Sequence, residues 1–272
     1  MASVPVLFYV SSMGNSILPG QRGRFEATDR DAFDDGWDLA EDDRLVATEV
    51  RLERPRTALS YNRSPDLPFD RSINPYRGCE HGCIYCYARP SHAFLNLSPG
   101  LDFETRLIAR PGIAEVLAAE LRRPGYKIAP VAIGTNTDPY QPVERTHRLM
   151  RDILAVLRDF NHPVWITTRG TLVERDIDLI APMAARGLAA VSISVTTLDE
   201  GLARKMEPRA PAPQRRLQII RSLVAAGIPV RIQISPLIPA LTDHELEAVM
   251  EAGARAGALY ATSIPLRLPL EV

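Results

Sequence analysis

Two hydrophobic periods alternate along the chain from about residue 71 onward. Apolar residues three and four apart predict helices, and short apolar runs bounded by turn residues predict strands. The predicted helices cover residues 112–123, 143–160, 172–187, 196–206, 214–227 and 242–257. The predicted strands cover residues 71–76, 130–135, 163–168, 188–195, 229–235 and 258–268.

Local signals mark several helix ends. Gly187 follows a helical stretch and suits the left-handed position that ends a helix. Prolines between residues 208 and 213 separate two helical stretches. Thr242 lies three residues before Glu245, a spacing that predicts a capping box at the start of the last helix.

Strand–helix alternation with short connections predicts a parallel sheet covered by helices. Either a (β/α) barrel or an open doubly wound sheet fits this order, and both place ligands at the carboxyl ends of the strands. Five segments that follow the predicted strands are rich in polar residues. These segments are the cysteine window and residues 134–142, 167–170, 194–200 and 235–243. We therefore expect the site at that edge.

The first part of the chain has a different composition. From Glu26 to Asp43 there are nine acidic residues and one basic residue. We expect residues 1–45 to be a solvated, disordered segment, residues 46–70 a linker, and residues 71–272 a single core domain.

Overall composition argues against a strongly basic nucleic-acid or membrane binder, a membrane-spanning protein and a disulfide-rich protein. The net charge of −1 provides no bulk positive field for nucleic acid or anionic membranes. No apolar run approaches the roughly 18 residues of a membrane span. Three cysteines in one window make a poor disulfide framework. These features together favour a cytoplasmic protein without membrane partners.

All three cysteines lie in the window GCEHGCIYCYA, residues 78–88, with the spacing Cys79-x3-Cys83-x2-Cys86. Buried thiols on one helical face are one interpretation, but Gly78 and Gly82 disfavour a helix.

A metal site is the stronger interpretation of this window. Zinc would require a fourth ligand, for which His81 and His92 are the nearest candidates. An iron–sulfur cluster takes thiolate ligands, and three ligands to a four-iron cluster leave one iron open to substrate or cofactor.

The window, with Tyr85 before the last cysteine, resembles the signature of the radical S-adenosylmethionine (SAM) superfamily. The surrounding blocks resemble its spore-photoproduct-lyase-like branch, and they are SINPYRGCEHGCIYCYARPSH, GLDFETRLIAR, IGTNTDPYQPVER, VTTLDE, EPRAPAPQRRLQIIRSLVAAGIPV and LRLPLEV. The resemblance covers roughly residues 45–272. It implies a partial (β/α)6 barrel, shortened at the C-terminus, because family members continue beyond the last block.

The resemblance also implies the site residues. Cys79, Cys83 and Cys86 would hold a [4Fe–4S] cluster whose open iron chelates SAM. The implied SAM contacts are Tyr85 at the adenine, Thr137 and Asp138 at the amino group, Arg169 at the carboxylate and Ser194 at the ribose. The family's Gly-Gly-Glu type motif is absent here, and an Asx turn before Pro139 is an alternative role for Asp138. Salt bridging and core packing are the alternatives for Arg169 and Ser194.

The implied activity is reductive cleavage of SAM to methionine and a 5′-deoxyadenosyl radical that abstracts hydrogen from a substrate. A flavodoxin- or ferredoxin-type donor would supply the electron. Nucleic acid is a compatible but not favoured substrate. Spore photoproduct lyase uses a further cysteine as hydrogen-atom donor, and this chain has Thr135 in that region, with Tyr140 or Tyr76 as substitutes. The alternative function is a non-catalytic metal-binding module, either structural zinc or a degenerate cluster carrier.

Overall fold

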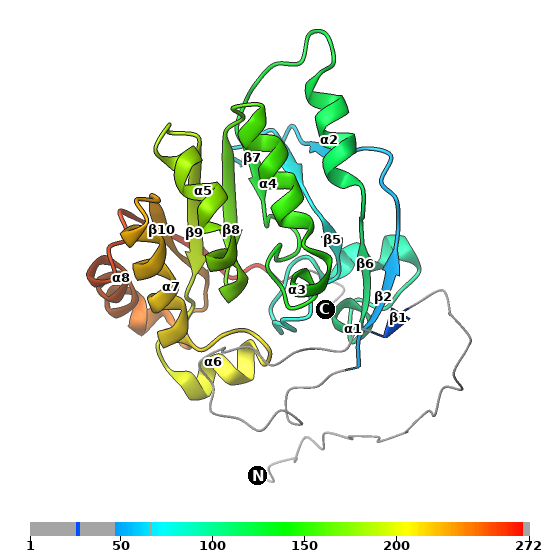
Figure 1. Ribbon diagram of the computed structural model, residues 1–272. Helices are drawn as coiled ribbons and strands as arrows, with labels where there is room; N and C mark the ends of the chain where they lie inside the picture. Colours follow the sequence, from blue (N-terminus) through cyan, green and yellow to red (C-terminus); the bar gives the residue numbers. More distant parts are fainter. Residues whose placement is uncertain (1–25, 28–46, 66, 269–272) are drawn as a thin grey trace.

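The computed structural model describes residues 26–27, 47–65 and 67–268 (Figure 1). The expectation of disorder for residues 1–45 therefore lies almost entirely outside the described residues. Among the described residues, no helix has the length and apolar character needed to cross a membrane.

A seven-stranded sheet forms the centre of the molecule, with the strand order β11-β10-β9-β8-β7-β4-β3. Six strands run parallel in chain order, and they are β4 (Arg71–Ile73), β7 (Val131–Ile133), β8 (Val164–Thr168), β9 (Ala189–Ser194), β10 (Val230–Leu237) and β11 (Tyr260–Pro265). β3 (Leu59–Tyr61) pairs antiparallel with β4 at one edge. The strand order never reverses as it does in a doubly wound sheet, so the fold is the expected partial (β/α)6 barrel.

Helices cover one face of this sheet (Figure 1). The longer ones are α2 (Ile113–Leu121), α4 (Leu149–Asp159), α5 (Ile177–Ala184), α7 (Pro213–Ala225) and α8 (Leu246–Arg255). Their apolar residues form one cluster with Val164, Ile166, Val230 and Ile232, which alternate along the strands. Because side chains of a strand alternate between its two faces, the residues between them point to the opposite side, here called the inner face.

A second sheet lies beside the first, with the order β1-β2-β6-β5. Its strands are β1 (Glu26–Ala27), β2 (Glu49–Leu52), β5 (Tyr76–Arg77) and β6 (Arg106–Ala109). The predicted strand 71–76 is thus divided between two sheets, because β4 ends before Pro75. Residues 46–70, expected as a linker, contribute β2 and β3.

Short helices complete the fold near the carboxyl ends of the strands. They are α1 (Asp102–Thr105), α3 (Glu144–His147), α6 (Glu200–Met206) and the 3-10 helices η2 (Arg89–Leu95), η3 (Thr171–Asp176) and η4 (Asp243–Glu245).

Two predictions about helix boundaries are wrong. The predicted helix 143–160 is two helices, α3 and α4, because Arg148 between them has a left-handed φ of 51°. The predicted capping box does not form. Thr242 Oγ1 accepts a hydrogen bond from the Ile238 amide at 2.9 Å, and Glu245 accepts one from the Thr197 hydroxyl. Thr242 thus binds a backbone amide four residues earlier, and Glu245 binds a residue 48 positions away.

Candidate functional site

The cysteine window forms an irregular loop between β5 and η2, at the carboxyl edge of the main sheet. Gly78 and Gly82 have φ values of +81° and +67°, in the left-handed region that favours glycine. A Cβ atom at Gly82 would lie 2.1 Å from the guanidinium of Arg209. The loop conformation rules out the alternative of three thiols on one helical face.

Side chains from distant segments hold this loop in place. Gln141 binds both sides of Cys79, since its Oε1 accepts from the Glu80 amide at 2.9 Å and its Nε2 donates to the Gly78 carbonyl at 3.0 Å. Gln141 is completely buried. Arg209 Nε donates to the Glu80 carbonyl at 2.5 Å, and Arg89 donates to the Cys83 carbonyl through two nitrogens. The backbone of the loop is therefore fixed independently of any ligand.

The three thiols lie close together in a nearly dry environment. Cys86 packs against apolar clusters that contain Cys79 on one side and Cys83 on the other. Burial raises the pKa of all three thiols, that of Cys83 to about 12, although the nearby Arg169 acts in the opposite direction. Such thiols ionise at neutral pH when a metal centre supplies positive charge. Three clustered thiols, two of them buried and that of Cys86 half-buried, fit an iron–sulfur cluster.

The two histidines considered as a fourth zinc ligand both have other neighbours in the structure. His92 Nε2 lies 2.9 Å from the Arg106 carbonyl, and its ring packs edge-on against Phe103. His81 Nδ1 lies 3.5 Å from Asp138 Oδ2, and burial lowers the pKa of His81 to about 4.

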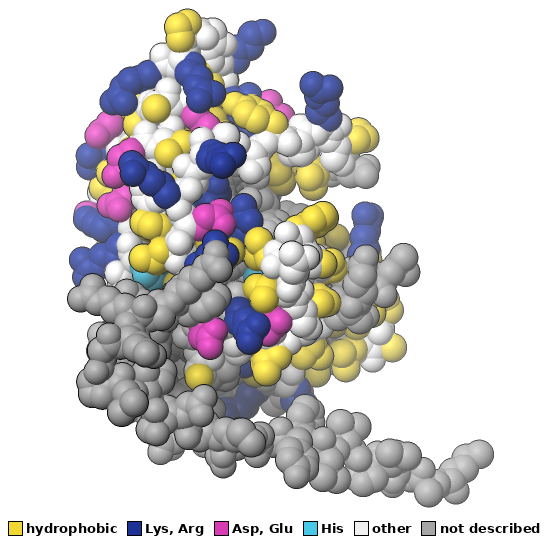
Figure 2. Space-filling model, turned by 90° about the vertical axis from the view of Figure 1, so that its right-hand side faces the viewer, with side chains coloured by type: hydrophobic (Ala, Val, Ile, Leu, Met, Phe, Trp, Pro, Cys, Tyr) yellow, Lys and Arg dark blue, Asp and Glu magenta, His cyan; other side chains and the backbone are white. Residues whose placement is uncertain are grey.

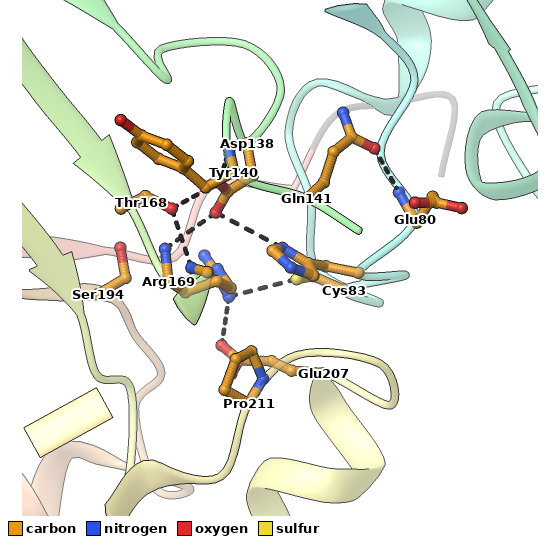
Figure 3. Close-up of polar contacts among 12 residues, drawn as sticks. Glu80, Cys83, Asp138, Tyr140, Gln141, Thr168, Arg169, Ser194, Glu207 and Pro211 are labelled. Atoms are coloured by element: carbon orange, nitrogen blue, oxygen red, sulfur yellow. Dashed lines mark hydrogen bonds and ion pairs between the residues drawn. The ribbon is translucent and has the colours of Figure 1, made fainter. Parts of the chain in front are cut away.

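Arg169 connects the cysteine loop to a buried carboxylate, as Figure 3 shows. Its Nη1 lies 3.2 Å from Cys83 Sγ, 2.8 Å from the Tyr85 hydroxyl and 2.5 Å from Glu207 Oε1. Glu207 also pairs with Arg216 and accepts from the Thr196 hydroxyl at 2.9 Å. A cation is thus held beside one thiol by a carboxylate that no solvent reaches.

Asp138 forms the Asx turn that the sequence left open as an alternative. Its Oδ1 accepts from the Tyr140 amide at 2.9 Å and from the Thr168 hydroxyl at 2.6 Å. Its Oδ2 accepts from the Arg169 amide at 2.9 Å. The carboxylate therefore ties the end of β7 to the end of β8 and orients the backbone of Arg169.

The remaining predicted SAM contacts lie at the same edge with different surroundings. Tyr85 is buried, and its hydroxyl donates to Glu207. Thr137 is buried and donates to the Tyr76 carbonyl at 3.0 Å, so its hydroxyl faces β5. Ser194 is buried at the end of β9 and is shown beside Arg169 in Figure 3. Arg169, Tyr85 and Ser194 are brought together with the cysteines, whereas Thr137 and Asp138 have structural partners.

The two tyrosines considered as hydrogen-atom donors are both buried away from solvent. The Tyr76 hydroxyl donates to Glu144. Tyr140 lies beneath Gly170, where its carbonyl oxygen is 2.2 Å from a Cβ placed on that glycine. Tyr87, directly after Cys86, is instead 63% exposed, and its hydroxyl donates to the Thr135 carbonyl.

Sequence reasoning missed Gln141, Glu207 and Arg216. Glu207 and Arg216 fall within the resembling block EPRAPAPQRR. The contacts of Glu207 with Tyr85 and Arg169, and of Arg216 with Glu207, were not foreseeable from spacing. Gln141 follows the predicted strand at 130–135 within a polar segment, which is the available signal for it.

Comparisons with known proteins agree with this geometry. The model of the radical SAM superfamily matches residues 73–253. An uncharacterized protein of Mycobacterium bovis is 42% identical over 204 residues, which cover 74% of this chain and 60% of that protein. An uncharacterized protein of Methanocaldococcus jannaschii is 27% identical over 173 residues, covering 64% of this chain and 62% of the relative. The chain thus spans about 60% of the length of these relatives.

Solved structures share the fold at low sequence identity. A spore photoproduct lyase mutant with bound SAM and a dinucleoside spore photoproduct superposes with a TM-score of 0.62 and 13% identity, covering 81% of this chain and 63% of the lyase. The SuiB protein of Streptococcus suis bound to SAM gives a TM-score of 0.55 and 15% identity, covering 72% of this chain and 40% of SuiB. The match over residues 73–253 and the loop of three cysteines lead to one conclusion: the chain belongs to the radical SAM superfamily.

Proposed function

We propose that this protein is a radical SAM enzyme whose cluster is held by Cys79, Cys83 and Cys86. The observation that carries the proposal is the position of three clustered thiols, two buried and that of Cys86 half-buried, in one fixed loop at the carboxyl edge of a parallel barrel, beside the Arg169 guanidinium. A [4Fe–4S] cluster with SAM supplies reductive cleavage to methionine and a 5′-deoxyadenosyl radical that abstracts hydrogen from substrate. A flavodoxin- or ferredoxin-type donor is the proposed source of the electron.

The protein's own residues prepare the site. Arg169 places a positive charge beside Cys83 Sγ, which favours the ionised sulfur. Glu207 and Tyr85 fix the orientation of that guanidinium. Arg169, Tyr85 and Ser194 remain the proposed contacts for SAM. The proposed main role of Asp138 is positioning, because its carboxylate already accepts three hydrogen bonds, two of which come from residues at the end of β8.

Nucleic acid stays a less favoured substrate. Of the seven arginines between residues 51 and 89, three are paired with acidic side chains, namely Arg71 with Asp70, Arg77 with Glu53 and Arg89 with Glu104. On the face that Figure 2 shows, Lys and Arg side chains are interspersed with acidic and hydrophobic ones. These arginines and this face do not form the continuous basic surface that typically binds a phosphate backbone.

Anaerobic reconstitution with iron and sulfide tests the proposal. We expect the reduced protein to convert SAM to 5′-deoxyadenosine, and we expect Cys83→Ala to lose both the iron and this activity. Ile84→Ala is the matched control in the same loop, because the Ile84 side chain is 58% exposed, and it should retain its iron. Full iron content in Cys83→Ala, or zinc in place of iron in the wild type, would contradict the assignment.

A further inference from the structure

The inner face of the main sheet differs in chemistry from the helix-covered face. On β8, Val164 and Ile166 join the core, while Trp165 and Thr167 point to the inner face. On β10, Val230, Ile232 and Ile234 join the core, so Arg231 and Gln233 face inward. These four inward-facing residues are each half-buried, so part of each side chain is accessible to a ligand.

Arg231 lies between two aromatic rings on this inner face. Its guanidinium carbon is 4.3 Å from the centroid of the Trp165 ring and 5.9 Å from that of Tyr260. Trp165 belongs to β8 and Arg231 to β10, with β9 between them. The residues in register on β9 are Ala190 beside Trp165 and Ser192 beside Arg231. These small side chains let the arginine extend across β9 to the indole.

The guanidinium of Arg231 has no acidic partner among the residues the structure describes, and no hydrogen bond of its side chain is found there. The arginines at the opposite end of the strands differ, because Arg169 and Arg216 both bind Glu207. Stacking uses the flat faces of a guanidinium and leaves its N–H edge available, and that edge matches the geometry of carboxylates and phosphates. Arg231 therefore has the orientation, but not the partner, of an anion-binding residue.

Further polar groups lie along the inner face from the level of Arg231 towards the cysteine loop. They are the side chains of Thr167, Ser192, Ser194, Gln233 and Thr262, and within the described ranges none of them is recorded in a side-chain hydrogen bond. Trp165 on β8 is four residues from Arg169, which directly follows that strand, and this corresponds to about 13 Å at the usual rise of a strand. A ligand of that length would reach from Arg231 to the candidate site.

We propose that Arg231, stacked between Trp165 and Tyr260, binds an oxyanion of the substrate, either a phosphate or a carboxylate. The role as a substrate subsite rests on the proposed radical SAM function, whereas anion binding itself rests on the geometry of the three side chains. The substrate would then carry its anionic group at the end remote from the hydrogen that is abstracted.

Tryptophan fluorescence tests this proposal without iron or SAM. The chain has two tryptophans, so Trp37→Phe leaves Trp165 as the sole reporter. The full-length variant is titrated with inorganic phosphate and, separately, with acetate, at constant ionic strength set by chloride. We expect a saturable change in Trp165 emission with a dissociation constant on the order of 1 mM, as suits a single ionic contact. Saturation by phosphate alone assigns a phosphate, and saturation by acetate alone assigns a carboxylate.

Variants of the stack complete the test. Arg231→Gln in the same background should abolish saturation, and Tyr260→Leu, at a position 63% exposed, should weaken binding about tenfold. Arg221→Gln, an exposed arginine on α7, is the matched control and should bind like its parent.

If neither anion gives a saturable signal, or if Arg231→Gln binds as well as Arg221→Gln, the proposal is overturned. Should Arg231→Gln fail to fold, Tyr260→Leu is the remaining test, and unchanged anion affinity in that variant overturns the proposal. None of these results bears on 5′-deoxyadenosine formation, so the two proposals fail separately.

Discussion

Glu207 and Glu144 are both fully buried carboxylates paired with arginine, yet their pKa values move in opposite directions. The pKa of Glu207 is lowered from 4.5 to about 2, because the charges of Arg216 and Arg169 outweigh its burial. The pKa of Glu144 is raised from 4.5 to about 7, because burial outweighs Arg175 and the Tyr76 hydroxyl. Glu207 stands beside the cysteine loop, and Glu144 begins α3.

The number and sharing of cations explain the difference. Glu207 has two arginines, with side chains 15% and 1% exposed. Among the described residues, Glu144 pairs with one arginine, Arg175, which also pairs with Asp176 at 2.8 Å. One shared cation does not offset the loss of water around a carboxylate, whereas two do. The region near the cysteines therefore keeps a fixed negative charge, and the α3 region holds one that titrates near neutral pH.

Glu207→Gln should have the largest effect. It leaves Arg169 and Arg216 buried without a carboxylate, which costs about 3–5 kcal/mol of the free energy of unfolding. Urea unfolding at pH 7 measures this loss. Glu200→Gln, an exposed position on α6, is the control and should change stability by less than about 0.5 kcal/mol. A loss below about 1 kcal/mol for Glu207→Gln would show that the network is not stabilising.

The pH dependence of Glu144 should come next in size. Its folded pKa is raised, so its contribution to stability is fully present below pH 4.5 and is lost as the pH rises towards 7. Wild type should lose up to about 3 kcal/mol relative to Glu144→Gln between pH 4.5 and 8. Urea unfolding of both proteins at several pH values checks this.

Glu207 supplies the contrast in the same pH range. Its folded pKa is lowered, so its contribution is present above pH 4.5 and is lost only as the pH falls towards 2. The deficit of Glu207→Gln should accordingly stay constant from pH 5 to 8. Parallel pH profiles for Glu207→Gln and Glu144→Gln would contradict the difference between the two sites.

Removing one hydroxyl at each site gives the smallest effect. Thr196→Val removes a donor to Glu207, and Tyr76→Phe removes a donor to Glu144. Each should cost about 1 kcal/mol at pH 7. Between pH 5 and 8 the cost of Thr196→Val should be constant, while that of Tyr76→Phe should grow as Glu144 ionises. Equal pH dependence of the two variants, measured by thermal unfolding, would argue against the assigned pKa directions.

Much of the fold was predictable because it depends on short-range patterns. Short apolar runs in the sequence predict the buried strands. Apolar residues with a 3.6-residue period that ends near Gly227 predict the helix α7. The site was only partly predictable. The cysteine window is local, but Glu207 contacts Tyr85 across 122 residues, a pairing that no period encodes. Glu245 satisfied a local capping rule and binds Thr197 instead, because the fold brings a better partner within reach.

The way the cysteine loop is held has a consequence for biosynthesis. Gln141 follows Cys86 by 55 residues, whereas Glu207 and Arg209 follow it by 121 and 123, and all three bind the loop. At a ribosomal rate of about 5–20 residues per second, the three thiols emerge on the order of ten seconds before Arg209 does. During that interval they are accessible to oxidants and to foreign metals. We therefore expect the proposed cluster to be inserted only after Arg209 has been synthesised.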